Sequence, residues 1–128
     1  AQIYLEQAIE LGDEYYPLPA GAFRGSLAVL KAEEGHVKEA RELVRLGEEQ
    51  ISSFPKEHGK LLCKWARVEL CAGDTHEARQ VYLRAQSIAD TLALPPANEL
   101  RQAIDDVGEI LPGMPGVKSR AALSSRAH

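Results

Sequence analysis

The chain matches itself when it is shifted by 38 residues, and this internal offset limits the folds that it can adopt. The matching positions cluster around a glycine that is followed by Glu-Ala-Arg. The identical pairs are Gly21 and Gly59, Ala28 and Ala66, Gly35 and Gly73, Glu39 and Glu77, Ala40 and Ala78, and Arg41 and Arg79. A fixed period between about 20 and 50 residues is typical of solenoids, in which one supersecondary unit recurs along the chain.

Apolar residues recur at helical spacing along most of the chain, and the alternation typical of strands is missing from the sequence. The clearest stripe consists of Ala78, Val81, Tyr82, Ala85, Ile88, Ala89 and Leu92. Asp74 precedes this stripe and Glu77 follows three residues later, which predicts a capped helix start. We expect an all-α fold of about six antiparallel helices, over residues 1–12, 21–34, 37–53, 57–72, 75–92 and 97–111.

Each residue type that recurs has a local physical role. Gly35 and Gly73 allow the chain to reverse in a tight turn between two helices. Ala40 and Ala78 are small where paired helices would cross closely. Bulky Trp65 is expected to fill the space between stacked hairpins, together with Tyr82. Gly12 is expected to end the first helix, and Pro17 and Pro19 are expected to lengthen the connection that follows it.

Composition excludes several classes of protein. The chain has 128 residues and a formal net charge of −4, so neither nucleic acid nor an anionic membrane surface is an expected partner. It has no apolar run long enough to span a bilayer and no signal-peptide pattern. Cys63 and Cys71 are eight positions apart, about 12 Å along one helix, so they cannot form a disulfide. Two free thiols favour a reducing, cytoplasmic location.

The sequence resembles the tetratricopeptide repeat (TPR) family, whose unit is a pair of helices with small and large residues at fixed places. Counted from Gly59, the residues at these places are Trp65, Ala66, Gly73, Ala78, Tyr82 and Ala85. Counted from Gly21, they are Leu27, Ala28, Gly35, Ala40, Val44 and Gly47. The resemblance implies a right-handed α-α superhelix. The spacing of 38 rather than the usual 34 resembles the longer units of bacterial regulatory ATPases and kinesin light chains.

This resemblance divides the chain into a helical-repeat domain and a tail. The domain covers residues 1–111 and comprises a partial unit (1–20), two full units (21–58 and 59–96) and a capping helix (97–111). The tail, residues 112–128, is expected to be flexible. The partial first unit predicts an uncovered apolar face around Ile3, Leu5, Ala8 and Ile9, which allows a homodimer, and it predicts that the chain is part of a longer protein.

The resemblance also implies a concave surface that is formed by the first helix of each unit. Its expected binding residues, on the last two of these helices, are Lys60, Lys64, Arg67, Asn98 and Arg101. Four of these side chains are positive, which suits a protein or peptide partner with acidic groups. The alternative is an ordinary solvated surface or a face that is buried against the rest of a longer protein. The asparagines of the TPR carboxylate clamp have no counterpart here.

No catalytic or cofactor-binding motif is present in the sequence, so we expect neither an enzyme nor a bound cofactor or metal. We therefore predict a non-catalytic protein–protein interaction module that binds a protein or peptide segment in its groove. The alternative is a regulatory or sensor TPR segment of a larger multidomain signalling or transcription-regulating protein.

Overall fold

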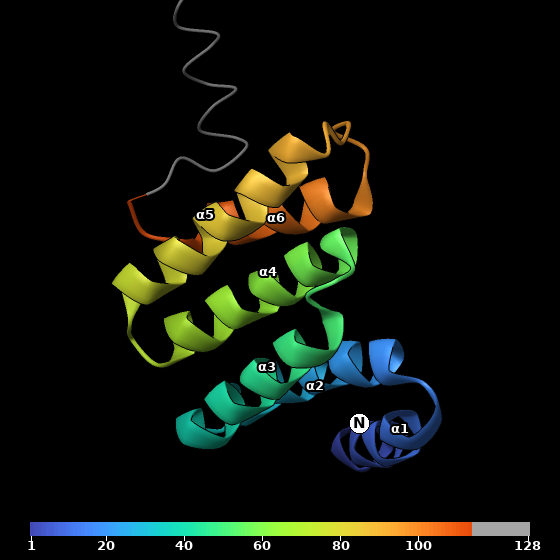
Figure 1. Ribbon diagram of the computed structural model, residues 1–128. Coiled ribbons are helices and arrows are strands. Elements are labelled where there is room, and N and C mark those ends of the chain that lie inside the picture. The colour runs from blue at the N-terminus through green and yellow to red at the C-terminus, as the bar shows by residue number, and fades with distance from the viewer. Residues whose placement is uncertain (114–128) are drawn as a thin grey trace, which may run out of the picture.

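Six α-helices and no strand make up residues 1–113, the part of the chain that a computed structural model describes (Figure 1). The helices are α1 (Gln2–Tyr15), α2 (Pro17–Glu33), α3 (Val37–Ile51), α4 (Pro55–Cys71), α5 (Thr75–Thr91) and α6 (Glu99–Ile110). The expected all-α class and the six helices are thereby confirmed. Of the tail expected over 112–128, residues 114–128 lie outside the described part.

Two expectations about the first connection are wrong. Pro17 and Pro19 do not lengthen it but belong to the first turn of α2, and Tyr16 alone joins the two helices. Backbone N–H groups in a first turn have no partner within the helix, so proline loses nothing there. Gly12 does not end α1, which continues to Tyr15. It is buried instead, and a Cβ at Gly12 would lie 2.8 Å from the Cβ of Ala20, so glycine permits a close helix crossing.

The expected turns at Gly35 and Gly73 are confirmed and have the same geometry. Both glycines have positive φ, 90° and 80°. The amide of His36 donates to the carbonyl of Lys31 at 2.8 Å, and the amide of Asp74 donates to that of Glu69 at 2.9 Å. This six-to-one hydrogen bond with a left-handed residue is the Schellman end of a helix. Asp74 then accepts a bond from the amide of Glu77, as the sequence predicts.

The same turn closes α5, but an alanine occupies the left-handed position. Ala93 has φ 53°, and the amide of Leu94 donates to the carbonyl of Ala89 at 3.1 Å. The Cβ of an L-residue is crowded in this conformation, at a cost of about 1 kcal/mol. The connection from α5 to α6 is also longer than the other turns, since it runs over residues 92–98.

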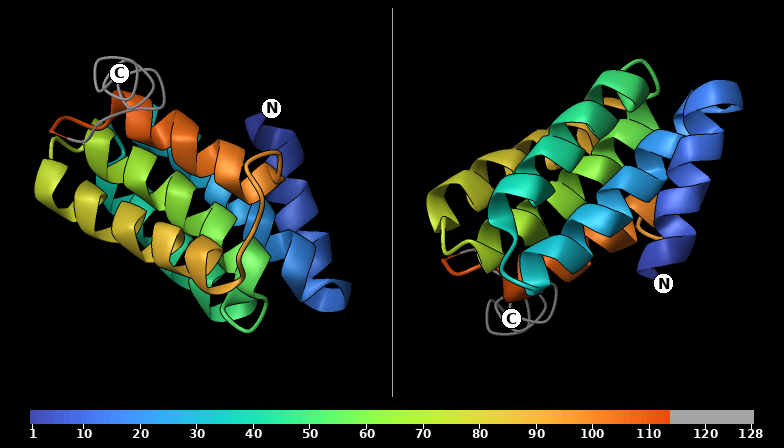
Figure 2. Two further views of the ribbon diagram at one scale, coloured as in Figure 1. Left: turned by 90° about the horizontal axis from the view of Figure 1, so that it is seen from above. Right: turned by 90° about the horizontal axis from the view of Figure 1, so that it is seen from below.

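Each helix packs against the helices before and after it in the chain. Helix α4 has the most partners, because it contacts four other helices. Helix α4 lies between α2 and α6 and also packs against α3 and α5. Helices α1 and α6 lie at opposite ends of the described part and do not touch (Figures 1 and 2). None of the helices in residues 1–113 is both long and apolar enough to cross a membrane.

Two clusters of buried side chains form the core, and α4 contributes to both. One cluster joins α4, α5 and α6 around Tyr82, which is 1% exposed. The other joins α2, α3 and α4 around Val44 and Val68. Trp65 is partly buried and packs against both clusters, so its expected place between hairpins is confirmed.

A buried carboxylate connects α3 to α4 beside this tryptophan. Glu69 is only 3% exposed. The guanidinium of Arg41 donates to both of its oxygens, with the shortest distance 2.6 Å, and the indole of Trp65 donates at 3.1 Å. Charged donors on both oxygens offset the loss of water around the carboxylate. Arg79 is the equivalent of Arg41 by the offset of 38, but it donates to the exposed carbonyl of Pro112.

Exchange of glycine and alanine at the two left-handed positions should have opposite effects. We expect Gly73→Ala to lower the free energy of unfolding by about 1 kcal/mol and Ala93→Gly to raise it by up to about 1 kcal/mol. No atom lies within 4 Å of a Cβ placed at Gly73, so backbone conformation alone decides the first effect. Urea unfolding followed by circular dichroism measures both. Two changes of the same sign would contradict this account of the turns.

Removal of Arg41 should cost more than removal of its repeat equivalent. We expect Arg41→Ala to lower the free energy of unfolding by about 1–3 kcal/mol, because it leaves a buried carboxylate with one donor fewer. Arg79→Ala is the matched control and should cost less than about 1 kcal/mol, since its acceptor is open to water. Equal losses in urea unfolding would show that Glu69 does not need the guanidinium.

Candidate functional site

A pocket of about 270 Å³ lies where α2, α4 and α6 come together. Helix α4 supplies most of its wall, and α2, α3 and α6 complete it. The lining residues are Ala22, Ile51, Glu57, Lys60, Leu61, Cys63, Lys64, Arg67, Glu99, Ala103 and Asp106. Three cations and three carboxylates therefore share one small, partly apolar space.

The charges of this pocket form two facing rows. Lys60 and Arg67 stand on α4, and Glu99 and Asp106 stand on α6 at positions 39 higher. At one end of the pocket the charges are paired with one another, because the Lys60 ammonium lies 3.1 Å from a carboxylate oxygen of Glu99 and 3.3 Å from one of Glu57. At the other end, neither Arg67 nor Asp106 forms an ion pair or side-chain hydrogen bond within residues 1–113. This end has an unpaired charge of each sign.

Lys64 connects the row on α4 to α2. Its ammonium donates to the Ser26 hydroxyl at 3.0 Å and to the Ala22 carbonyl at 3.3 Å. Gly25 makes room for this side chain, since a Cβ there would lie 2.9 Å from the Cδ of Lys64. Burial is the largest influence on this ammonium and lowers its pKa, because loss of water disfavours the charged form.

Cys63 lies on the floor of the pocket and is a poor nucleophile. It is 3% exposed, and burial raises the pKa of its thiol to about 12. The thiolate, which is the reactive form, is therefore scarce at neutral pH. Cys63 and the exposed Cys71 are both free, as their spacing predicts. Within residues 1–113, no group of three or more histidine, cysteine or acidic side chains is arranged to hold a metal ion.

The structure brings together three of the five predicted binding residues. Lys60, Lys64 and Arg67 line the pocket, whereas Asn98 and Arg101 do not. Asn98 caps α6, with its side-chain oxygen accepting from the Leu100 amide at 2.8 Å. Arg101 donates to the Leu94 carbonyl at 3.0 Å and to Asp90 at 2.8 Å, which ties α6 to α5 and the connection before it.

Sequence reasoning missed the acidic half of the pocket. Glu57, Glu99 and Asp106 all line it, yet none was among the predicted binding residues. The count that selected Asn98 and Arg101 kept the offset of 38, whereas the residues of α6 that face Lys60 and Arg67 in the pocket stand 39 positions higher. Nothing in the sequence before α6 indicates a shift of one position.

Comparison with known proteins gives no relative from which to transfer a function: no protein-family model, no curated protein and no solved structure matches the chain.

The buried ammonium of Lys64 predicts a pH dependence of stability. Its pKa in the folded chain lies below the ordinary 10.5, so the unfolded chain binds more protons between these two values. Stability therefore rises with pH across that window. We expect the free energy of unfolding of the wild type to rise relative to that of Lys64→Met as the pH approaches 10.5. Urea unfolding at pH 7, 9 and 10.5 measures this difference, and a constant or falling difference would contradict it.

Proposed function

We propose that the six helices stack as a TPR-like α-solenoid in which α2, α4 and α6 form the inner row. Three observations support this arrangement. Helices α2, α4 and α6 contact one another in sequence, while α2 and α6 do not touch in the described part. Helices α2 and α4 begin 38 positions apart, as do α3 and α5. The two hairpin turns share one hydrogen-bond pattern.

The function that this geometry favours is non-catalytic binding of a protein or peptide segment along the inner row. The observation that supports it best is the end of the pocket where Arg67 and Asp106, which have no ion pair within residues 1–113, stand beside the buried Cys63 and the partly buried Ala103. A guanidinium that has no carboxylate partner within residues 1–113 can take one from a ligand, with hydrogen bonds to charged groups worth about 1.5–3 kcal/mol. The segment therefore carries an acidic group for Arg67, and a basic neighbour complements Asp106.

The size of the pocket favours a side chain of a longer segment over a small effector. Its volume of about 270 Å³ falls below the range of about 300–1,000 Å³ that is usual for small-molecule sites. A peptide that follows the inner row can place one side chain in this space and make its other contacts outside. This consideration ranks the interaction module above a small-molecule sensor of a larger regulatory protein.

Selection from a random peptide display library tests this function and does not require the partner to be identified first. We expect the enriched peptides to contain an acidic residue and to lose at least about tenfold in affinity on Arg67→Glu, a change of about 1.4 kcal/mol. The reason is that the substitution places a carboxylate where the ligand carboxylate would lie. Fluorescence anisotropy with the enriched peptides measures the affinities.

Lys38→Glu is the matched control for this experiment. Lys38 lies exposed on α3, outside the pocket, and its reversal changes the net charge by the same amount. Circular dichroism establishes that both variants remain folded. If the enriched peptides bind the Arg67→Glu variant as tightly as the wild type, the inner row is not the binding surface.

A further inference from the structure

Helix α1 exposes large apolar side chains along one flank. Ile3 is 71% exposed, Tyr4 is 65% exposed and Leu11 is 58% exposed. The sequence predicts an apolar face at this end, but different residues form it. Of the residues expected there, Ile3 is exposed, whereas Ile9 is buried against the rest of the domain. Compared with the predicted apolar face, the exposed apolar side of α1 is therefore shifted around the helix toward Tyr4 and Leu11.

This flank borders a shallow groove of about 350 Å³ between α1 and α2. Its lining is mostly carbon, with Tyr4, Ala8 and Leu11 on one side and Pro19 and Phe23 on the other. The rings of Tyr4 and Phe23 meet edge to face with centroids 6.4 Å apart, which fixes the groove wall. The groove is separate from the pocket of the inner row, since the two share no lining residue.

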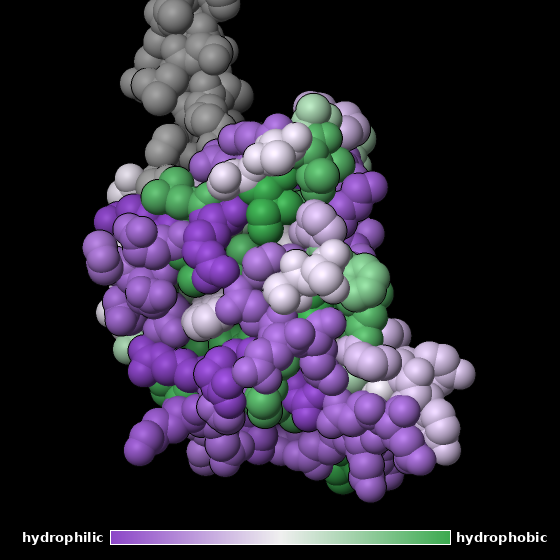
Figure 3. Space-filling view, in the orientation of Figure 1, coloured by the Kyte–Doolittle hydropathy of each residue, from purple (hydrophilic) through white to green (hydrophobic). Residues whose placement is uncertain are grey.

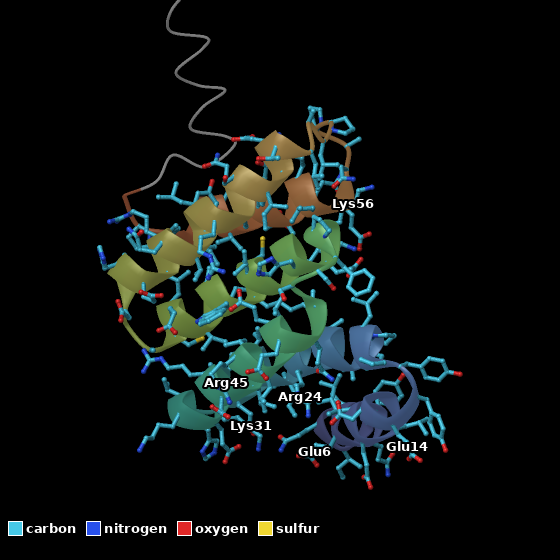
Figure 4. The ribbon with its side chains drawn as sticks, in the orientation of Figure 1. Glu6, Glu14, Arg24, Lys31, Arg45 and Lys56 are labelled. Atoms are coloured by element: carbon cyan, nitrogen blue, oxygen red, sulfur yellow. The ribbon has the colours of Figure 1, made fainter. Side chains whose placement is uncertain are left out.

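Three exposed carboxylates, Glu6, Glu10 and Glu14, are spaced four apart along the outer side of α1, and none has an ion pair within residues 1–113. Glu10 and Glu14 adjoin the edge of the groove that Gln7 and Leu11 form, whereas Glu6 lies farther round the helix. Figure 4 shows Glu6 and Glu14 on the side of α1 that faces away from the other helices. Helix α1 contains no lysine or arginine. Its remaining acid, Asp13, is held by Arg24, with one bond of 2.7 Å, which also lowers the pKa of Asp13.

We infer that this surface, the α1 groove with its row of glutamates, binds a basic amphipathic helix of a partner protein. An apolar stripe on such a helix fits the groove that Leu11 and Phe23 line, and lysines or arginines at its edge face Glu10 and Glu14. A second copy of this chain fits less well, because two-fold pairing places the acidic row of one α1 beside that of the other. An anionic membrane surface is excluded by the same charge.

Two designed peptides serve as probes for this inference. The first is an 18-residue helix with leucines at spacings of three and four and lysines beside them, and the second replaces every lysine with glutamate. We expect the lysine peptide to bind the 128-residue chain at least tenfold more tightly than the glutamate peptide, with an affinity that falls as salt rises. Fluorescence anisotropy at 50 mM and 500 mM salt measures both. Equal affinities would overturn the inference.

Variants of the chain locate the binding on α1. The double variant Glu10→Lys with Glu14→Lys and the single variant Leu11→Ser should each weaken the lysine peptide at least tenfold. Glu109→Lys on α6 is the control for general charge attraction and should leave the affinity within a factor of two. Arg67→Glu should also leave it unchanged, which separates this surface from the inner row. If Glu109→Lys weakens binding as much as the double variant, the inference is wrong.

Two further measurements identify a different occupant. A dimer in sedimentation velocity that Leu11→Ser dissociates would assign the α1 groove to a second copy and overturn the inference. The basic segment 114–128 is the other candidate. If a chain of residues 1–113 binds the lysine peptide tenfold more tightly than the full chain, that segment occupies the groove, which also overturns it.

Discussion

The described part of the domain depends on the ability of α4 to bury two opposite sides at once. Leu62 and Ala66 of α4 pack toward α5 and α6, while Val68 packs toward α2 and α3. Trp65 spans the boundary between these clusters, and its indole donates to the buried Glu69. A polar group at so central a position is stable only because Arg41 of the preceding helix supplies the opposite charge. Packing and charge together therefore fix how the second hairpin sits on the first.

The same arrangement decides which charges remain available to a ligand. Several charges on α3 and α5 are paired with one another or with α4: Glu48 of α3, for example, accepts bonds from His58 of α4 and Arg84 of α5 at 2.7 Å. The surface on that side is mostly hydrophilic, with hydrophobic side chains in small separate patches (Figure 3). In the pocket between α2, α4 and α6, by contrast, Lys60 is paired, whereas Arg67 has no ion pair within residues 1–113. The binding proposed for this pocket therefore depends on the end where Arg67 stands.

Much of the fold could be predicted from the sequence because local chemistry determines it. A glycine after an apolar stripe and an aspartate before the next one define the turn at Gly73 and Asp74 without any tertiary information. The predictions for Pro17, Pro19 and Gly12 are wrong because the roles of these residues depend on the helix that packs beside them. Gly12 is a point of close contact with Ala20, and nothing in the residues around Gly12 indicates that contact.

The candidate site was only half predictable for a related reason. A count at constant period identifies Lys60 and Arg67, with Lys64 beside them, since α4 keeps the period of the chain. The period fails at the connection before α6, where Ala93 takes the left-handed position and the chain runs on through Pro95 and Pro96. The acidic wall follows from this local lengthening, which rotates Glu99 and Asp106 into the pocket and turns Arg101 toward Asp90.

The shared position of α4 also bears on cooperativity. In a linear array whose units touch only their neighbours, stability is a sum of unit and interface energies, and the end units can melt first. Here α4 belongs to both hydrophobic clusters, so loss of either cluster strips one side of the same helix. We therefore expect helices α2 to α6 to unfold together as one cooperative unit rather than one hairpin at a time.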